Sequence, residues 1–197
     1  MKYAMRVGGK DIEMHLEKNG ELLTNDYSET YYTEDGTPVT STPQDVDHCY
    51  YHGTIVNDSE STVSMSTCDG LRGYFRTAAQ RYLIEPLSKP VVCGVTNTSW
   101  NADYPPITSK SRSRASYKNM KSNLRELRKR MFEVVNFVNM VYKPLNTFIA
   151  LVGLEVWSDN DKISVTAPAG ATLDAFTKWR NSNLVNTKHH DNAHLIR

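Results

Sequence analysis

The sequence predicts an α+β protein, in which a β-rich first half precedes a unit made of a long helix, a buried strand and a second helix. Polar and apolar residues alternate in the first half, where Ile12, Met14 and Leu16 are the apolar positions. This is the pattern of a strand with one buried face. Apolar residues then recur at three- and four-residue steps over 124–141, which predicts a helix, and residues 148–157 form one apolar run.

Short strands separated by turns are predicted along the first half. Residues 18–20 (Lys-Asn-Gly) predict a hairpin turn that returns the chain to residues 22–23, and residues 34–36 (Glu-Asp-Gly) predict a second hairpin. Residues 54–56 and 62–66 mix β-branched and polar side chains, as half-buried strands do.

Three cysteines lie in or beside these strands. Cys49 precedes one predicted strand and Cys68 follows another, so the pattern alone gives a β-meander in which a disulfide across it is one option. Cys93 stands in the segment SKPVVCGV, with a proline and a glycine close by.

The second half opens after a polar stretch over residues 97–118, which contains two adjacent prolines and the run KSRSR and therefore reads as an exposed linker. The expected buried face of the long helix consists of Leu124, Leu127, Met131, Val134, Val138 and Val141. Its basic residues fall largely on the other side and are interpreted as a solvated face. Thr172 is the expected N-cap of the second helix.

Composition sets broad limits on function. Hydrophobic residues make up 39% and charged residues 23% of the 197 positions, as in globular proteins, and the net charge of +1 does not favour nucleic acid or an anionic membrane as a partner. The run over 148–157 is too short to span a bilayer. The first residues lack the apolar core of a signal peptide, which taken literally indicates an intracellular protein.

Several short sequence segments of the first half resemble the pro-segment of the ADAM and snake-venom (reprolysin) zinc metalloproteases. These segments are HCYYHG, STCDGLRGYF and YLIEPL, in the family's order, and the run LEKNGELLTNDYSETYYTEDG. In the second half, VGLEVWSDNDKI, ATLDAFTKWR and HDNAHLI resemble the opening part of the catalytic domain. The resemblance implies a reprolysin-type pro-segment over 1–96, a linker over 97–118 and the N-terminal part of a metalloprotease domain over 119–197, truncated before the zinc motif.

The resemblance also assigns roles to individual residues. The oxidising setting of the family implies that Cys49 and Cys68 pair, whereas Cys93 resembles the family's cysteine switch, whose thiolate takes the fourth zinc position of the protease. A simpler alternative is that Cys93 is an unpaired or buried thiol without a functional role. Asn57 and Asn97 begin glycosylation triplets, which fit a secreted protein but also occur by chance.

The chemistry of a metalloprotease is not complete in this sequence. The family's H-E-x-x-H-x-x-G-x-x-H motif does not occur. His48 and His52, like His190 and His194, are spaced i, i+4, but on a strand this spacing separates them by roughly 13 Å, too far for two ligands of one zinc. Asp191 matches a calcium-binding position in some relatives; a turn cap is the simpler role.

Two departures from the family concern the sheet. The valine- and leucine-rich strand that normally precedes the long helix is absent, and the segment before Cys93 is shorter than usual. Without a neighbouring strand, residues 148–157 are expected to keep unpaired backbone groups.

The leading interpretation is therefore part of a secreted or membrane-anchored zinc metalloendopeptidase zymogen, with the pro-segment as inhibitor and chaperone. The expected partner is a metalloprotease catalytic domain in cis or in trans, with no nucleic acid or membrane contact from this segment. Zinc is expected in the full-length enzyme and not in this chain alone, which is expected to be inactive. The alternatives are a free-standing regulatory pro-segment that acts in trans and a non-functional truncated product.

Overall fold

The computed structural model describes residues 1–43, 46–86, 93–97 and 123–196, and for 93–97 it describes the backbone only. The described residues form two compact units. The first contains residues 1–22, 46–86, 93–97 and 130–150, and the second contains residues 23–43, 123–129 and 151–196. Strands dominate the first half and helices the second, which confirms the predicted α+β class.

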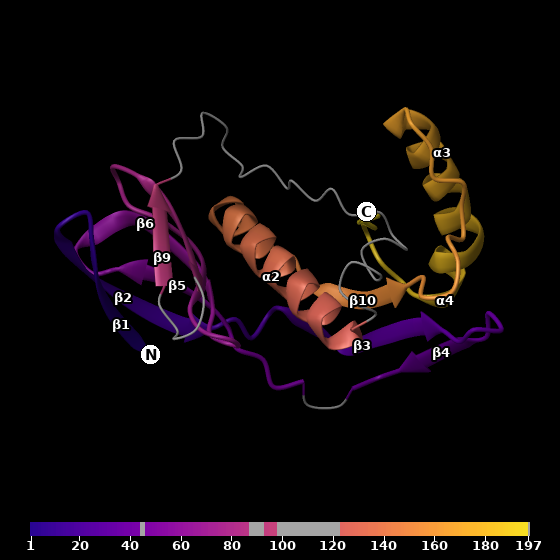
Figure 1. Ribbon diagram of the computed structural model, residues 1–197, viewed down its shortest axis with the longest axis horizontal. Coiled ribbons are helices and arrows are strands. Elements are labelled where there is room, and N and C mark those ends of the chain that lie inside the picture. The colour runs from indigo at the N-terminus through magenta and orange to yellow at the C-terminus, as the bar shows by residue number, and fades with distance from the viewer. Residues whose placement is uncertain (44–45, 87–92, 98–122, 197) are drawn as a thin grey trace. The chain divides into compact units, whose positions relative to one another are not determined.

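The first unit is built on a seven-stranded antiparallel sheet (Figure 1). Its strands, in spatial order, are β1 (Lys2–Val7), β2 (Lys10–Lys18), β5 (Tyr50–Ile55), β6 (Asp58–Ser66), β7 (Arg72–Arg76), β8 (Arg81–Pro86) and β9 (Cys93–Asn97). Neighbours in space are neighbours along the chain except at β2 and β5, between which the chain visits the second unit.

One apolar cluster fills the inside of this sheet. It runs from Val7 on β1 to Ile84 on β8 and includes Val63 and Phe75, both 0% exposed. Its residues come from β1, β2, β5, β6, β7 and β8, so the curled sheet surrounds a single core. In β2 every second residue, from Ile12 to Leu16, is buried in the cluster, which confirms the predicted alternation.

The long helix α2 (Leu124–Tyr142) contributes residues to both units. It begins after Asn123, whose side-chain oxygen accepts hydrogen bonds from the backbone N–H groups of Arg125 (3.0 Å) and Glu126 (3.3 Å), as an N-cap does. It ends at Tyr142, where the short helix η1 (Lys143–Leu145) brings in Pro144, which cannot continue an α-helix.

The buried face of α2 differs from the predicted one. The buried residues are Leu127, Phe132, Asn136, Asn139 and Met140. Of the predicted face only Leu127 is buried, whereas Met131, Val134, Val138 and Val141 are half-buried. The prediction was wrong because it counted apolar residues alone, and two asparagines take central places in the buried face.

The second unit contains a three-stranded sheet in the order β10 (Leu151–Val156), β3 (Leu23–Tyr32) and β4 (Pro38–Ser41). The antiparallel β3–β4 hairpin turns at Gly36, whose φ is 83°, which confirms the second predicted hairpin. The first predicted hairpin, at residues 18–20, was wrong, because β2 pairs with β1 and β5 while β3 lies in this other sheet.

Helices follow the three-stranded sheet along the chain. They are α3 (Ala169–Trp179), η2 (Arg180–Leu184) and α4 (Val185–Thr187). Trp179 packs edge-on against Trp157 after β10, with ring centroids 5.0 Å apart. Thr172 is not the predicted N-cap: α3 begins three residues earlier, after Pro168, and the buried Thr172 hydroxyl bonds to the backbone of Thr166.

Candidate functional site

The outer face of the β5–β6 pair is buried although it is polar. Tyr50 lies opposite Ser66, and His52 lies opposite Ser64, so these four side chains share one face of the sheet. All four are at most 9% exposed. Val63 and Met65 alternate with the two serines and face the apolar core, so β6 is buried on both sides. A buried polar face of this kind needs hydrogen-bonding partners.

Asn136 of α2 supplies these partners. Its side-chain nitrogen donates to Ser64 Oγ (2.8 Å) and to the backbone oxygen of Tyr51 (3.3 Å), and its side-chain oxygen accepts from Asn19 Nδ2 (2.9 Å). His52 Nε2 lies 2.7 Å from the backbone oxygen of Asn136, and since that oxygen can only accept, His52 carries its proton on Nε2. Asn136 is 2% exposed.

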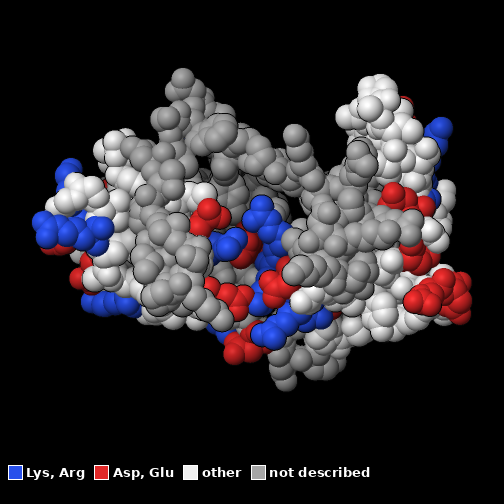
Figure 2. Space-filling view, in the orientation of Figure 1, with Lys and Arg blue, Asp and Glu red and all other residues white. Residues whose placement is uncertain are grey.

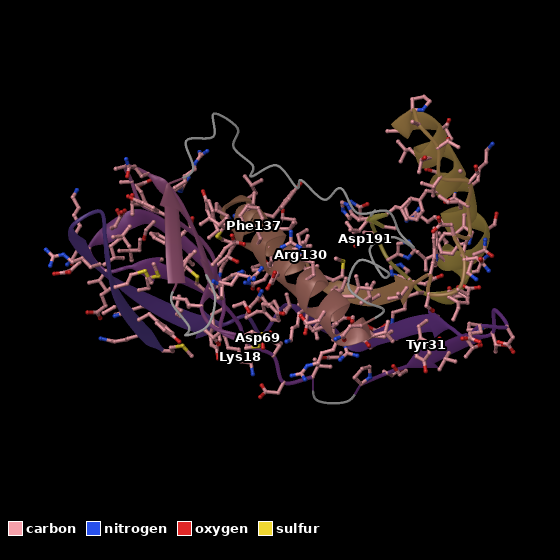
Figure 3. All side chains as sticks on the ribbon, in the orientation of Figure 1. Lys18, Tyr31, Asp69, Arg130, Phe137 and Asp191 are labelled. Atoms are coloured by element: carbon pink, nitrogen blue, oxygen red, sulfur yellow. A yellow bond between two sulfur atoms is a disulfide. The ribbon has the colours of Figure 1, made fainter. Side chains whose placement is uncertain are left out.

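Aromatic contacts flank this network. Phe132, one turn before Asn136, meets Tyr50 edge-on with centroids 5.8 Å apart, and Phe137 meets Tyr74 of β7 edge-on at 5.4 Å. Figure 3 labels Phe137 on α2, beside the sheet. Edge-to-face pairs of this kind add to the energy of burial. The second half of α2 therefore covers the sheet with apolar rings around a polar centre.

Burial shifts the pKa values of two titratable side chains in this contact. Burial lowers the pKa of His52; the bond to Asn136 works against this shift, Lys143 adds to it, and Glu21 opposes it. Burial also raises the pKa of Glu133, while the charges of Arg72 and Arg130 pull it down. Both shifts have the same physical cause, because a charged form is disfavoured where water is excluded.

In the second unit, β10 and β3 pair in parallel, with Gly153 opposite Ser28 and Val156 opposite Tyr31. The expectation that residues 148–157 would lack a neighbouring strand is therefore wrong for 151–156. The missing neighbour comes from the first half of the chain, far away in the sequence. Arg128 of α2 adds a two-pronged ion pair with Glu29 of β3, in which Nε lies 2.5 Å from Oε1 and the terminal nitrogen contacts Oε2.

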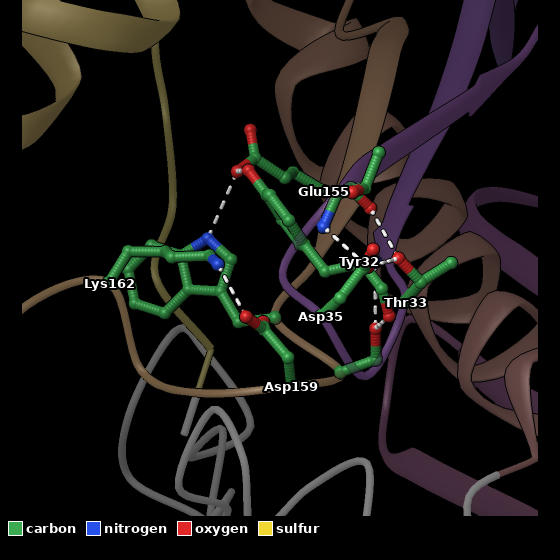
Figure 4. A network of polar contacts seen from close by, with 9 residues as sticks. Tyr32, Thr33, Asp35, Glu155, Asp159 and Lys162 are labelled. Atoms are coloured by element: carbon green, nitrogen blue, oxygen red, sulfur yellow. Dashed lines mark hydrogen bonds and ion pairs between the residues drawn. The ribbon is translucent and has the colours of Figure 1, made fainter.

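A polar network joins the ends of β3 and β10 (Figure 4). The hydroxyl of Tyr32 donates to Glu155 Oε1 (2.7 Å), which also accepts from Trp157 Nε1 (3.1 Å). Burial and the neighbouring carboxylate raise the pKa of Tyr32, so the phenol stays a donor. Lys162 lies 3.6 Å above the centre of the Tyr32 ring and pairs with Asp159 at 2.8 Å. These contacts fix side chains of the two strands to each other.

The surface charges are mixed. On the face shown in Figure 2, basic and acidic side chains lie next to one another, and the described residues there form no extended patch of one sign. Ion pairs such as Arg130–Glu133, at 3.4 Å, are of the exposed or half-exposed kind that contributes little to stability.

Cys49 and Cys68 form a disulfide with 5.2 Å between their Cα atoms. The bridge lies immediately beyond the pair Tyr50–Ser66, at the open end of the β5–β6 hairpin. Asn57 lies at the other end, in the turn, where it is exposed and adopts a left-handed φ of 62°. The side chains of Cys93 and Asn97 lie outside the described residues; their backbones are the two ends of β9.

The remaining candidate ligands are not gathered into a site. Asp191 is exposed, and its backbone oxygen accepts a 3.5 Å bond from Arg180 (Figure 3 labels Asp191). His190 bonds to Arg180 through Nε2 (2.9 Å) and to the backbone of Lys188 through Nδ1, which leaves neither ring nitrogen free for a metal. Among the described residues no three His, Cys, Asp or Glu side chains converge as a metal site. These residues therefore do not fit a catalytic zinc.

Sequence reasoning missed Asn136 and Asn139. The signal that could have found Asn136 is its position, since an asparagine four residues after Phe132 falls on the same helix face.

Two segments of the chain match known families. Residues 112–197 match the reprolysin (M12B) family of zinc metalloproteases, and residues 1–56 match the reprolysin family propeptide. No solved structure matches the chain. In the part of the chain that the structure describes, no helix is long and apolar enough to cross a membrane.

Proposed function

Because this chain belongs to the reprolysin (M12B) family of zinc metalloproteases, we propose that it is part of a zymogen in which the pro-segment folds against the opening part of the catalytic domain and holds it inactive. The proposal includes a secreted or cell-surface setting, to which the Cys49–Cys68 disulfide gives support. It also includes glycosylation at Asn57, which is exposed in a turn, and at Asn97.

The observation that carries the proposal is the parallel pairing of β3 with β10. β3 lies in the propeptide match and β10 in the catalytic-domain match. A buried or half-buried strand with an unpaired edge loses hydrogen bonds to water without replacement and invites aggregation. β3 supplies those hydrogen bonds to one edge of β10, which is what a chaperone segment must do for an incomplete sheet.

The inhibitory part of the proposal rests on Cys93. A thiolate is a strong zinc ligand, so this residue of the pro-segment is proposed to occupy the zinc position that water needs in a complete catalytic domain. One such contact is readily displaced, and most of the affinity must come from the surface that holds the pro-segment in place.

Cleavage of the intact chain between its two matched segments tests the proposal. A site for a sequence-specific protease, inserted between Lys110 and Ser111, gives a nicked chain with all other residues in place. We expect the two fragments to stay together in size-exclusion chromatography at about 1 μM. A dissociation constant of this size corresponds to a binding free energy of about 8 kcal/mol. Fragments that separate at this concentration while keeping their circular dichroism would refute the proposed holding function.

The same nicked chain tests the thiolate. Added to a smaller amount of an active metalloprotease of this family, at a concentration below the dissociation constant of its own two fragments so that the pro-segment fragment is free, it should slow peptide cleavage, and the Cys93→Ser chain should do so more weakly. Equal inhibition by both chains would remove the role of Cys93 and leave steric blocking. No inhibition by a folded wild-type chain would remove the inhibitory function altogether.

A further inference from the structure

The buried polar face of β5–β6 has no ordinary structural reason to be polar. Replacing buried polar groups by apolar ones of similar shape is often neutral or stabilising, and in some proteins buried polar groups serve specificity instead. His52 and Ser64 lie opposite each other on this face, and both are covered by α2. Here the cost of an incorrect partner is high, because any group that fails to bond them leaves them buried and unpaired.

The orientation of the Asn136 amide is fixed by its neighbours. The backbone oxygen of Tyr51 can only accept, so the side-chain nitrogen of Asn136 must face it and its oxygen must face Asn19. Asn19 is itself oriented, because its own side-chain oxygen already accepts the backbone N–H of Glu21 (3.2 Å). The sheet therefore presents two acceptors and one donor in fixed places, and an asparagine side chain matches all three.

Other side chains at position 136 do not match this arrangement. Aspartate has the shape of asparagine but no donors, and it would direct a charged oxygen at the Tyr51 carbonyl. Leucine fills similar space without bonding to Asn19, Ser64 or Tyr51. Discrimination of this kind, in which a site built for hydrogen bonds rejects an analogue that lacks them, is stronger than discrimination by an apolar pocket.

We infer that the outer face of β5–β6 is a recognition site for one kind of helix, which carries asparagine at the position of Asn136 and phenylalanine four residues before it. The helix that fits lies in the catalytic-domain match of this chain; of the groups that bond to it, Asn19, Tyr51 and His52 lie in the propeptide match, and Ser64 lies between the two matches. The inference rests on the proposed function and gives it a selectivity: the pro-segment accepts reprolysin catalytic domains that present this asparagine on the helix corresponding to α2, in cis or in trans.

Asn139 provides a matched control on the same helix. It is also asparagine and is 1% exposed, one turn after Asn136, yet neither its side-chain nitrogen nor its oxygen has a hydrogen-bonding partner among the described residues. A change at Asn139 therefore alters helix propensity and burial in the same way as a change at Asn136, but removes no bond to the sheet.

The test compares variants of the nicked chain by their fragment dissociation constants. Three lost bonds of ordinary net strength predict that Asn136→Leu weakens association roughly 100-fold, with a similar loss for Asn136→Asp. Asn139→Leu should not weaken association, since no bond is lost and an unpaired buried amide is removed. Equal effects at the two positions overturn the inference while leaving the proposed function intact, whereas fragments that separate in the wild-type chain refute the proposed function itself.

A double-mutant cycle separates recognition from a general loss of stability, and its Ser64→Ala arm leaves Asn136 unchanged if the Asn136 variants fold poorly. Ser64→Ala on the sheet should weaken association in the wild-type chain, and should cost little more in the Asn136→Ser chain, where the longer amide reach is already lost. Additive effects of the two substitutions overturn the inference, because they mean that the side chains do not recognise each other.

Discussion

Removal of the Cys49–Cys68 disulfide should destabilise the chain by an amount that the structure fixes. The bridge closes a loop with a sequence separation of 19. In the chain-entropy description, opening a loop of this length costs about 3 kcal/mol of unfolding free energy. The loop is the β5–β6 hairpin, and the bridge joins its open end, whereas the turn at Asn57 joins the other end.

Urea denaturation of the Cys49→Ala/Cys68→Ala chain measures this cost against the wild-type chain. The Cys93→Ser chain is the control, because it changes a cysteine and leaves the bridge in place. Reduction of the wild-type chain should reproduce the effect of the double substitution. A loss below about 1 kcal/mol in both experiments would contradict the loop-entropy argument and mean that the hairpin is equally ordered without its bridge.

The same substitution has a consequence for helix recognition. The bridge lies next to the pair Tyr50–Ser66, two residues along each strand from His52 and Ser64. A hairpin that frays from its open end loses the spacing of the groups that bond to Asn136. Fragment association in the nicked chain should therefore weaken along with stability, and an unchanged dissociation constant would show that fraying does not reach His52.

Two further predictions concern the pH dependence of stability and the close packing of the backbone at Gly53. Burial lowers the pKa of His52 in the folded chain below the value near 6.5 that it has in the unfolded chain. The stability that neutral His52 contributes is therefore complete above about pH 6.5. It is lost as the pH falls below this value, by up to about 1.4 kcal/mol per pH unit. Unfolding titrations from pH 7.5 to 5.5 should show a smaller decline in stability for His52→Gln than for the wild-type chain. Gly53→Ala should cost about 3 kcal/mol or more, because its Cβ would lie 2.0 Å from the backbone oxygen of His15. Gly20→Ala, with nothing within 4 Å of its Cβ, should be nearly neutral in the same denaturation assay.

Local patterns predicted local structure well. The alternation at Ile12, Met14 and Leu16 identified both a strand and its buried face, because side chains in a strand point to opposite sides at every step. The glycine-containing turn at residues 34–36 identified the β3–β4 hairpin for a similar reason: it supplies the positive φ that the turn needs. Both signals depend on neighbouring residues only.

Pairings between distant segments could not be predicted in this way. The turn at residues 18–20 had the composition of a hairpin, yet the chain leaves the sheet there and β2 finds β5 instead. The neighbour of β10 is likewise β3, more than a hundred residues earlier. The hydrogen bonds between strands join backbone groups that every residue has, so the local sequence does not identify which of several strands will pair with a given edge. The linker and domain boundaries drawn at 97–118 stay a prediction.

The buried asparagines show the limit of hydrophobic periodicity. Met131, Val134 and Val138 gave the stronger apolar repeat, but Phe132, Asn136 and Met140 are the residues that α2 buries. Burial of Asn136 is favourable only because Asn19, Ser64 and Tyr51 are already in place to bond to it. That information lies in other parts of the chain, and no window along the helix contains it.

The two contacts between the matched segments therefore differ in what they recognise. The pairing of β3 with β10 rests mainly on backbone groups, with side-chain contacts such as Tyr32–Glu155 at its end, and it therefore sets looser limits on the strand that it accepts. The contact of Asn136 uses one side chain against fixed donors and acceptors, and we propose that it rejects most alternatives. Support for folding needs little selectivity, because its task is to satisfy an open edge, whereas inhibition of the correct enzyme needs much. A pro-segment that must do both gains by assigning them to separate surfaces, since a loss of selectivity at position 136 then leaves the strand pairing intact.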